Sequence, residues 1–127
     1  MGRRRIATSL VLTGFVVLTA VTAGNAASKV RHAPARATKT VNGVVTHWSP
    51  TTVRISEGDT IKWDAVSGSH TVSAYGGRWA FNRQLPNGAV RSRIFRDAGT
   101  FRFRCMIHST LTNGICSGMC GKVVVRG

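Results

Sequence analysis

Phe101-Arg-Phe-Arg-Cys105-Met-Ile-His108 and, further along, Met119-Cys-Gly-Lys-Val-Val-Val125 are the two segments of the chain that indicate its fold. In the first, apolar and basic residues alternate, which is the pattern of a strand with one buried face, and Cys105 and His108 lie at its end. The second places Met119 directly before a β-branched run. A thiolate, an imidazole and a thioether form a ligand set suited to copper, and His70 is the candidate for a second imidazole.

The rest of the chain from Val41 onward also has a β pattern. Short β-branched and aromatic runs alternate with turn residues, and no segment shows a sustained helical period, so we expect an all-β sandwich or barrel of about seven to eight strands. The expected strands are 41–48, 51–56, 60–65, 70–74, 90–95, 99–105 and 121–126. The side chains expected to point inward are Val53, Ile55, Ile61, Trp63, Val72, Ile94, Phe101, Phe103, Val123 and Val125.

The first 40 residues differ from this domain in composition. Arginines at positions 3 to 5 precede an apolar run from Ile6 to Ala23 and then small residues, which is the layout of an export signal cleaved after Ala26. An uncleaved anchor is the alternative. Residues 27–40 are basic and poor in apolar side chains, and we expect them to be a flexible linker. The predicted organisation is therefore a signal peptide at 1–26, a linker at 27–40 and a domain at 41–127, exported to the cell envelope or beyond.

The chain is strongly basic, with a net charge of +14. Removal of residues 1–26 takes away three arginines and no acid, which leaves a net charge of +11. Such a charge favours anionic partners, and we expect a redox partner with an acidic docking surface, an anionic membrane or a cell-wall surface. Export and the lack of a groove-reading motif argue against nucleic acid. We expect the protein to be a monomer.

Four segments together resemble the plastocyanin and azurin family of cupredoxins. They are Glu57-Gly-Asp-Thr-Ile-Lys-Trp63, Ser69-His-Thr-Val-Ser-Ala74, Ala98-Gly-Thr-Phe-Arg-Phe-Arg-Cys105-Met-Ile-His108 and Met119-Cys-Gly-Lys-Val-Val-Val125. The resemblance covers nearly everything after residue 41. It implies a Greek-key β-sandwich with one type 1 copper ion, in which His70, Cys105 and His108 are the close ligands and Met119 is the weak axial ligand.

The chain departs from that family between the last two ligands. In plastocyanin-like proteins the axial methionine follows the second histidine by a few residues, whereas here Ser109–Gly118 separates them. Met106 is the competing axial candidate. It adjoins Cys105, however, and neighbouring side chains of an extended chain point to opposite faces, so the pattern favours Met119.

Cys116 and Cys120 bracket Met119. In an exported protein two such cysteines most simply form a disulfide, which leaves Cys105 free as a ligand. Two alternatives remain open at this point. The segment from Cys116 to Gly121 also resembles the loop of dinuclear copper centres, although Val124 stands where that family has a histidine, and Cys105 could itself be disulfide-bonded.

Three classes of function fit these observations. The first is a carrier of single electrons that uses Cu(I)/Cu(II) cycling, and the absence of Met-rich or His-rich tracts from the sequence favours it. The second is a copper delivery or storage protein. The third is a cupredoxin-like module without metal. The ligand set implies no open coordination position, so we do not expect an enzyme.

Overall fold

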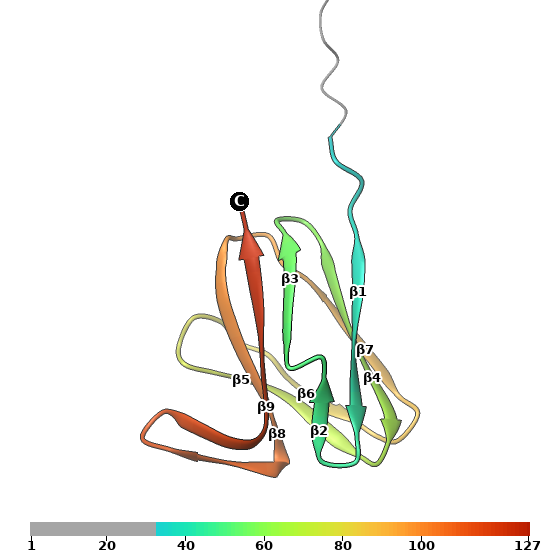
Figure 1. The fold of residues 1–127 in the computed structure, drawn as a ribbon, viewed down its shortest axis with the longest axis vertical. Coiled ribbons are helices and arrows are strands. Elements are labelled where there is room, and N and C mark those ends of the chain that lie inside the picture. Colours follow the sequence, from blue (N-terminus) through green and yellow to red (C-terminus); the bar gives the residue numbers. More distant parts are fainter. Residues whose placement is uncertain (1–32) are drawn as a thin grey trace, which may run out of the picture. The chain divides into compact units, whose positions relative to one another are not determined.

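A computed structural model describes residues 33–127 of the chain, and this part folds as two packed β-sheets (Figure 1). The predicted signal peptide and residues 27–32 of the predicted linker lie outside the described residues. Within 33–127 no helix is long and apolar enough to cross a membrane. The strands are β1 (Thr38–Val44), β2 (His47–Ser49), β3 (Thr52–Ser56), β4 (Thr60–Ser67), β5 (His70–Tyr75), β6 (Asn82–Leu85), β7 (Val90–Ile94), β8 (Gly99–Thr112) and β9 (Ile115–Arg126).

The two sheets are mixed. One has the strand order β2-β1-β4-β7 and the other β3-β9-β8-β5-β6. Strands β1 and β4 run parallel, as do β3 and β9, while the other pairs are antiparallel. The chain therefore passes repeatedly between the sheets, and the predicted all-β sandwich is confirmed.

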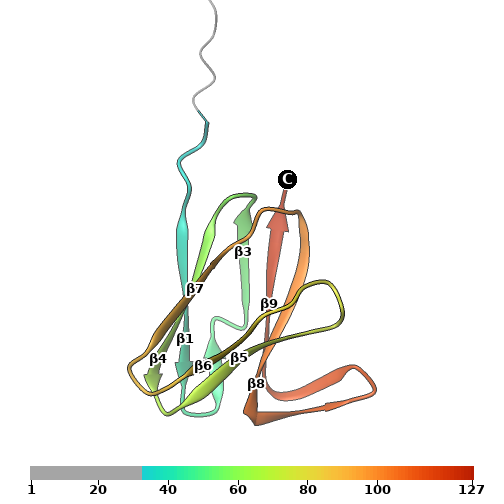
Figure 2. The ribbon, with the colours of Figure 1, turned by 180° about the vertical axis from the view of Figure 1, so that it is seen from behind.

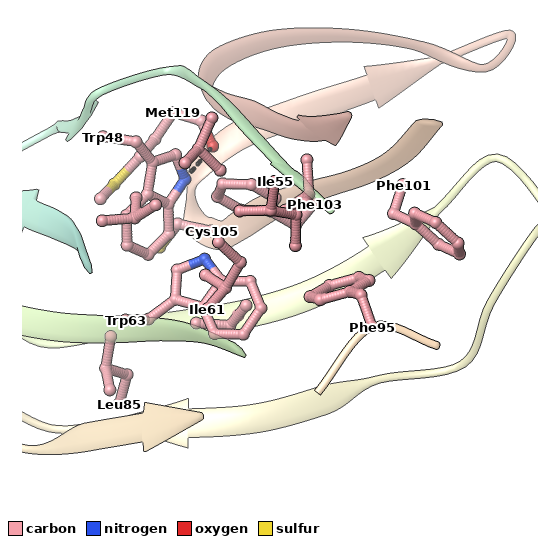
Figure 3. Close-up of a cluster of buried hydrophobic side chains, with 14 of the residues drawn as sticks. Trp48, Ile55, Ile61, Trp63, Leu85, Phe95, Phe101, Phe103, Cys105 and Met119 are labelled. Carbon is pink, nitrogen blue, oxygen red and sulfur yellow. Dashed lines mark hydrogen bonds between the residues drawn. The ribbon is translucent and has the colours of Figure 1, made fainter. Parts of the chain in front are cut away.

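The core lies between the sheets and is rich in aromatic side chains (Figure 3). Phe103 is fully buried and meets Trp48 and Trp63 edge to face, with ring centroids 5.5 and 5.4 Å apart. Nine of the ten side chains predicted to point inward are buried. The prediction for Ile94 is wrong, because it is 40% exposed while its neighbour Phe95 is 2% exposed. The chain leaves β7 at Ile94, and Phe95 turns inward to pack on Phe101 with ring centroids 5.0 Å apart.

Four strands differ clearly from the expected pattern. Strand β6 was not expected, because three of its four residues are polar and exposed, and its pairing with β5 fixes it instead. Strand β1 begins at Thr38, three residues before the expected domain start at Val41. Its first residues are exposed, yet their backbones pair with Thr60–Lys62 of β4. Strands β8 and β9 continue far beyond the segments expected, as described below.

Asp59 ties the start of β1 to the sandwich. Its side chain accepts hydrogen bonds from the backbone N–H groups of Ala37, at 2.7 Å, and Ser56, at 2.9 Å. These two bonds hold the pKa of Asp59 below its ordinary value, and the bond from Ala37 has the larger effect. The charge of Lys39 also lowers this pKa, whereas desolvation raises it. The ionised carboxylate therefore stabilises the folded chain.

We predict that Asp59→Asn weakens the dependence of stability on acid pH. The pKa of Asp59 is lower in the folded than in the unfolded chain. The stabilisation of the fold by Asp59 is therefore complete above about pH 3.8, and it is lost as the pH falls through the pKa of the folded chain. Urea unfolding between neutral pH and about pH 2 should show lower stability at neutral pH and a shallower acid decline than in wild type. Asp97→Asn, at an exposed acid, is the control, and an identical acid decline in the Asp59 variant would contradict the prediction.

Candidate metal centre

Three donor atoms converge at one end of the sandwich. They belong to His70 at the start of β5 and to Cys105 and His108 in β8, and all lie within 4.8 Å of one another. The Nδ1 atoms of the two histidines are 3.3 Å apart. The Sγ atom of Cys105 is 3.4 Å from Nδ1 of His108 and 3.9 Å from Nδ1 of His70. His70 and Cys105 are buried, and His108 is partly exposed.

The orientation of His70 is set by its second nitrogen. Nε2 lies 3.0 Å from the carbonyl oxygen of Ser67, which can only accept a hydrogen bond, so Nε2 carries the proton. Nδ1 then presents its lone pair toward Cys105 and His108. A partner of this kind is the usual way in which a protein fixes the tautomer of a metal-binding histidine.

Thr71 holds the segment after Cys105 in place. Its hydroxyl oxygen accepts the N–H of Met106 at 2.8 Å, and its own backbone N–H lies 3.5 Å from Sγ of Cys105. The hydroxyl of Ser73 donates to Thr71 at 3.1 Å. Both residues are buried in β5, so the strand that carries His70 also positions Cys105. We did not single out Thr71 from the sequence, although its place directly after His70 was a usable signal.

The fold has counterparts among solved structures. The chain matches no protein-family model and no curated protein. A variant of amicyanin in its reduced Cu(I) form at pH 4 matches with a TM-score of 0.57 and 23% identity, over 76% of this chain and 87% of that one. A methionine-to-glutamine variant of amicyanin with Cu(I) matches with a TM-score of 0.57 and 22% identity, over 70% of this chain and 82% of that one. The chain has the cupredoxin fold.

In this cupredoxin fold the segment after His108 is an ordered β-ribbon. Residues 109–112 of β8 pair with 115–118 of β9, and the ribbon extends away from the sandwich at the end opposite the C-terminus (Figures 1 and 2). Asn113 and Gly114 form its turn, both with positive φ, of 49° and 76°. This Asn-Gly pair is a strong hairpin signal that the sequence did offer.

A bulge in β8 lies between the ribbon and the body of the sheet. Arg104 pairs with Cys120 and Ser109 pairs with Gly118, so four residues of β8, Cys105–His108, face Met119 alone on β9. Gly118 is required there, because its φ is +96° and a Cβ at that position would lie 2.5 Å from the carbonyl oxygen of His108. The bulge therefore brings Cys105, His108 and Met119 to the same place on the sheet.

The cysteines and methionines around this bulge differ in bonding and in exposure. Cys116 and Cys120 form a disulfide, as predicted, and Cys105 is free and buried. Neither Cys116 nor Cys120 offers a thiolate, which removes the dinuclear alternative in this state of the chain. Met119 is 1% exposed, whereas Met106 is 50% exposed and belongs to the surface.

Trp48 fixes the backbone of Met119. Its buried indole N–H donates to the carbonyl oxygen of Met119 at 3.1 Å, the dashed line in Figure 3. The same ring packs against His70, with centroids 5.7 Å apart. The bond gives Trp48 a second role, since it joins β2 to the candidate axial residue.

Replacement of Trp48 tests this role in the metal-free protein. We predict that Trp48→Phe lowers the free energy of unfolding by about 1–3 kcal/mol more than Trp63→Phe, because it leaves the carbonyl of Met119 without its donor. Trp63 is the matched control: it is fully buried, and its N–H has no hydrogen-bond partner among the described residues. Urea unfolding gives the free energy of unfolding of both variants. An equal decrease in the two would show that the hydrogen bond from Trp48 to the Met119 carbonyl contributes nothing to stability.

Proposed function

We propose that this protein is an exported carrier of single electrons that binds one copper ion through His70, Cys105 and His108, with Met119 as the axial ligand. The observation that carries the proposal is the convergence of two imidazole nitrogens and one thiolate sulfur within 4.8 Å, on the fold of the cupredoxins. When bound, copper would supply a one-electron couple between Cu(I) and Cu(II).

The donor set supports copper rather than a hard cation. A soft thiolate with two imidazoles suits both oxidation states of copper, while oxygen ligands suit magnesium and calcium. Met119, which is buried beside Trp48, is the only thioether of the described residues that is not on the surface. The site thus fits type 1 copper.

The residues around the donors support electron transfer rather than substrate turnover. His70, Cys105 and Met119 are all buried, and Thr71, Ser67 and Trp48 hold them from three different strands. Ligands held in this way change position little when the charge of the ion changes, which favours fast electron exchange. The same burial argues against the ready release of copper that a delivery protein needs.

His108 is the residue that connects the site to the surface. It is partly exposed, and its neighbours Met106 and Ile107 are 50% and 58% exposed. An electron would leave through the edge of its imidazole ring to a partner that docks on this apolar surface. The net charge of the chain supports a partner that is acidic around the docking surface, and we expect the protein to act as a monomer.

The most direct test of the donor set is the addition of one equivalent of Cu(II) to the purified protein. The wild type should develop an intense visible band from charge transfer between the thiolate and copper, and it should show a reversible one-electron wave in voltammetry. Cys105→Ser should abolish both. His47→Ala, at an exposed histidine outside the cluster, should change neither. A band that survives in Cys105→Ser, or copper lost on each reduction, would contradict the proposal.

The axial role is tested by a matched pair of methionine variants. Met119→Leu should leave a coloured site and raise the reduction potential, because a donor that favours Cu(II) is lost from a buried position. Met106→Leu should leave the potential unchanged, since that side chain lies at the surface. A shift of the potential in Met106→Leu as large as that in Met119→Leu would contradict the assignment of Met119 as the axial ligand.

A further inference from the structure

The charges of this chain are unevenly distributed, and one side of the sandwich is far more basic than the candidate metal centre. Between Gly76 and Asp97 the sequence has five arginines and one acid, Asp97, whereas Cys105–Gly121 has no Asp, Glu, Lys or Arg. The basic segment forms β6 and β7, which are the edge strands of the two sheets. We call the five residues the arginine edge; they are Arg78, Arg83, Arg91, Arg93 and Arg96.

Aromatic rings orient the guanidinium groups at this edge. Trp79 and Phe81 are stacked, with ring centroids 5.6 Å apart and planes at 10°. The guanidinium carbon of Arg93 lies 5.3 Å from the Trp79 centroid and 5.6 Å from that of Phe81, and Arg83 lies 5.4 Å from Phe81. Side chains held in this way lose less conformational entropy when they bind an anion.

Arg93 also lines a hollow. One of its five N–H groups is used by the bond to the carbonyl oxygen of Ala80, at 3.0 Å, which leaves a planar fork for a second acceptor. The hollow has a volume of about 500 Å³, and Arg96, Ser92 and Asp97 line it as well, so one carboxylate stands beside two guanidinium groups. Its apolar walls are Phe95 and Phe101, which Figure 3 shows at the end of the core away from Met119 and Trp48. The hollow is thus separate from the metal centre.

We propose that the arginine edge is a second binding surface, which holds a linear polyanion whose phosphate groups enter this hollow. The five guanidinium groups are spread over β6, β7 and the residues that flank these strands, which is more than a single phosphate can contact. A flat bilayer does not reach a half-buried guanidinium in a hollow, whereas a protruding phosphate of a chain does, and the fork of Arg93 fits it with two parallel bonds. Binding there leaves the end around His108 free for a redox partner.

The probe for this surface is long-chain inorganic polyphosphate, titrated into the purified copper-free protein. We expect saturable binding that weakens with salt, because bound polyanion releases counterions. Arg78→Gln, Arg83→Gln and Arg96→Gln combined, at three exposed positions, should lower the affinity about tenfold or more and make the salt dependence shallower.

The control removes the same charge elsewhere. Arg54→Gln, Lys122→Gln and Arg126→Gln combined, at exposed positions on β3 and β9, should lower the affinity by less than about threefold. Arg93→Lys keeps the charge but loses the planar fork, and it should weaken binding severalfold. Circular dichroism and urea unfolding check that each variant is folded.

Three results would overturn the inference. Equal losses in the two triple variants would mean that net charge alone attracts the polymer. Tighter binding to phosphatidylglycerol vesicles than to polyphosphate would assign the surface to a membrane, and tighter binding to polyglutamate would assign it to an acidic protein. None of these measurements involves copper, so the proposal can fail while the proposed electron transfer function stands.

Discussion

The four-residue bulge in β8 is the constraint on which the candidate metal centre depends. Because Cys105–His108 face Met119 alone, two donors of β8 and the candidate axial donor of β9 lie side by side although ten residues separate His108 from Met119. The strands pair again beyond the bulge, so residues 109–118 form part of a ribbon that extends away from the sandwich. Gly118 and the hydrogen bond from the Met106 N–H to the hydroxyl oxygen of Thr71 keep the bulge in this form.

The donors are held by neighbours that belong to other parts of the sandwich. Ser67 at the end of β4 orients His70, Thr71 in β5 holds the chain after Cys105, and Trp48 in β2 holds the backbone of Met119. Both sheets therefore contribute to the site. A site built in this way is formed by the fold itself, and this is the physical basis for proposing a carrier rather than a protein that hands its copper over.

The sequence predicted the sandwich, since the alternation around Phe101 and Phe103 is a strong strand signal. It also singled out His70, Cys105 and His108, whose donor atoms the fold brings together. It failed where tertiary pairing outweighs local pattern. Strand β6 is polar and exists because β5 pairs with it, and Phe95 replaces Ile94 in the core because the chain turns after β7. The ribbon was treated as an inserted loop, although Asn113-Gly114 marked its turn. No local pattern could reveal the bond between Trp48 and Met119, which are 71 residues apart.

X-ray absorption at the copper edge, recorded on the loaded protein in both oxidation states, tests most directly whether the donors are preformed around one ion. We predict one short bond to sulfur and two bonds to imidazole nitrogen in each state, with bond lengths that change little between Cu(I) and Cu(II). Coordination by nitrogen and oxygen without a short sulfur bond, or a first shell that rearranges on reduction, would contradict the proposal of a preformed type 1 site.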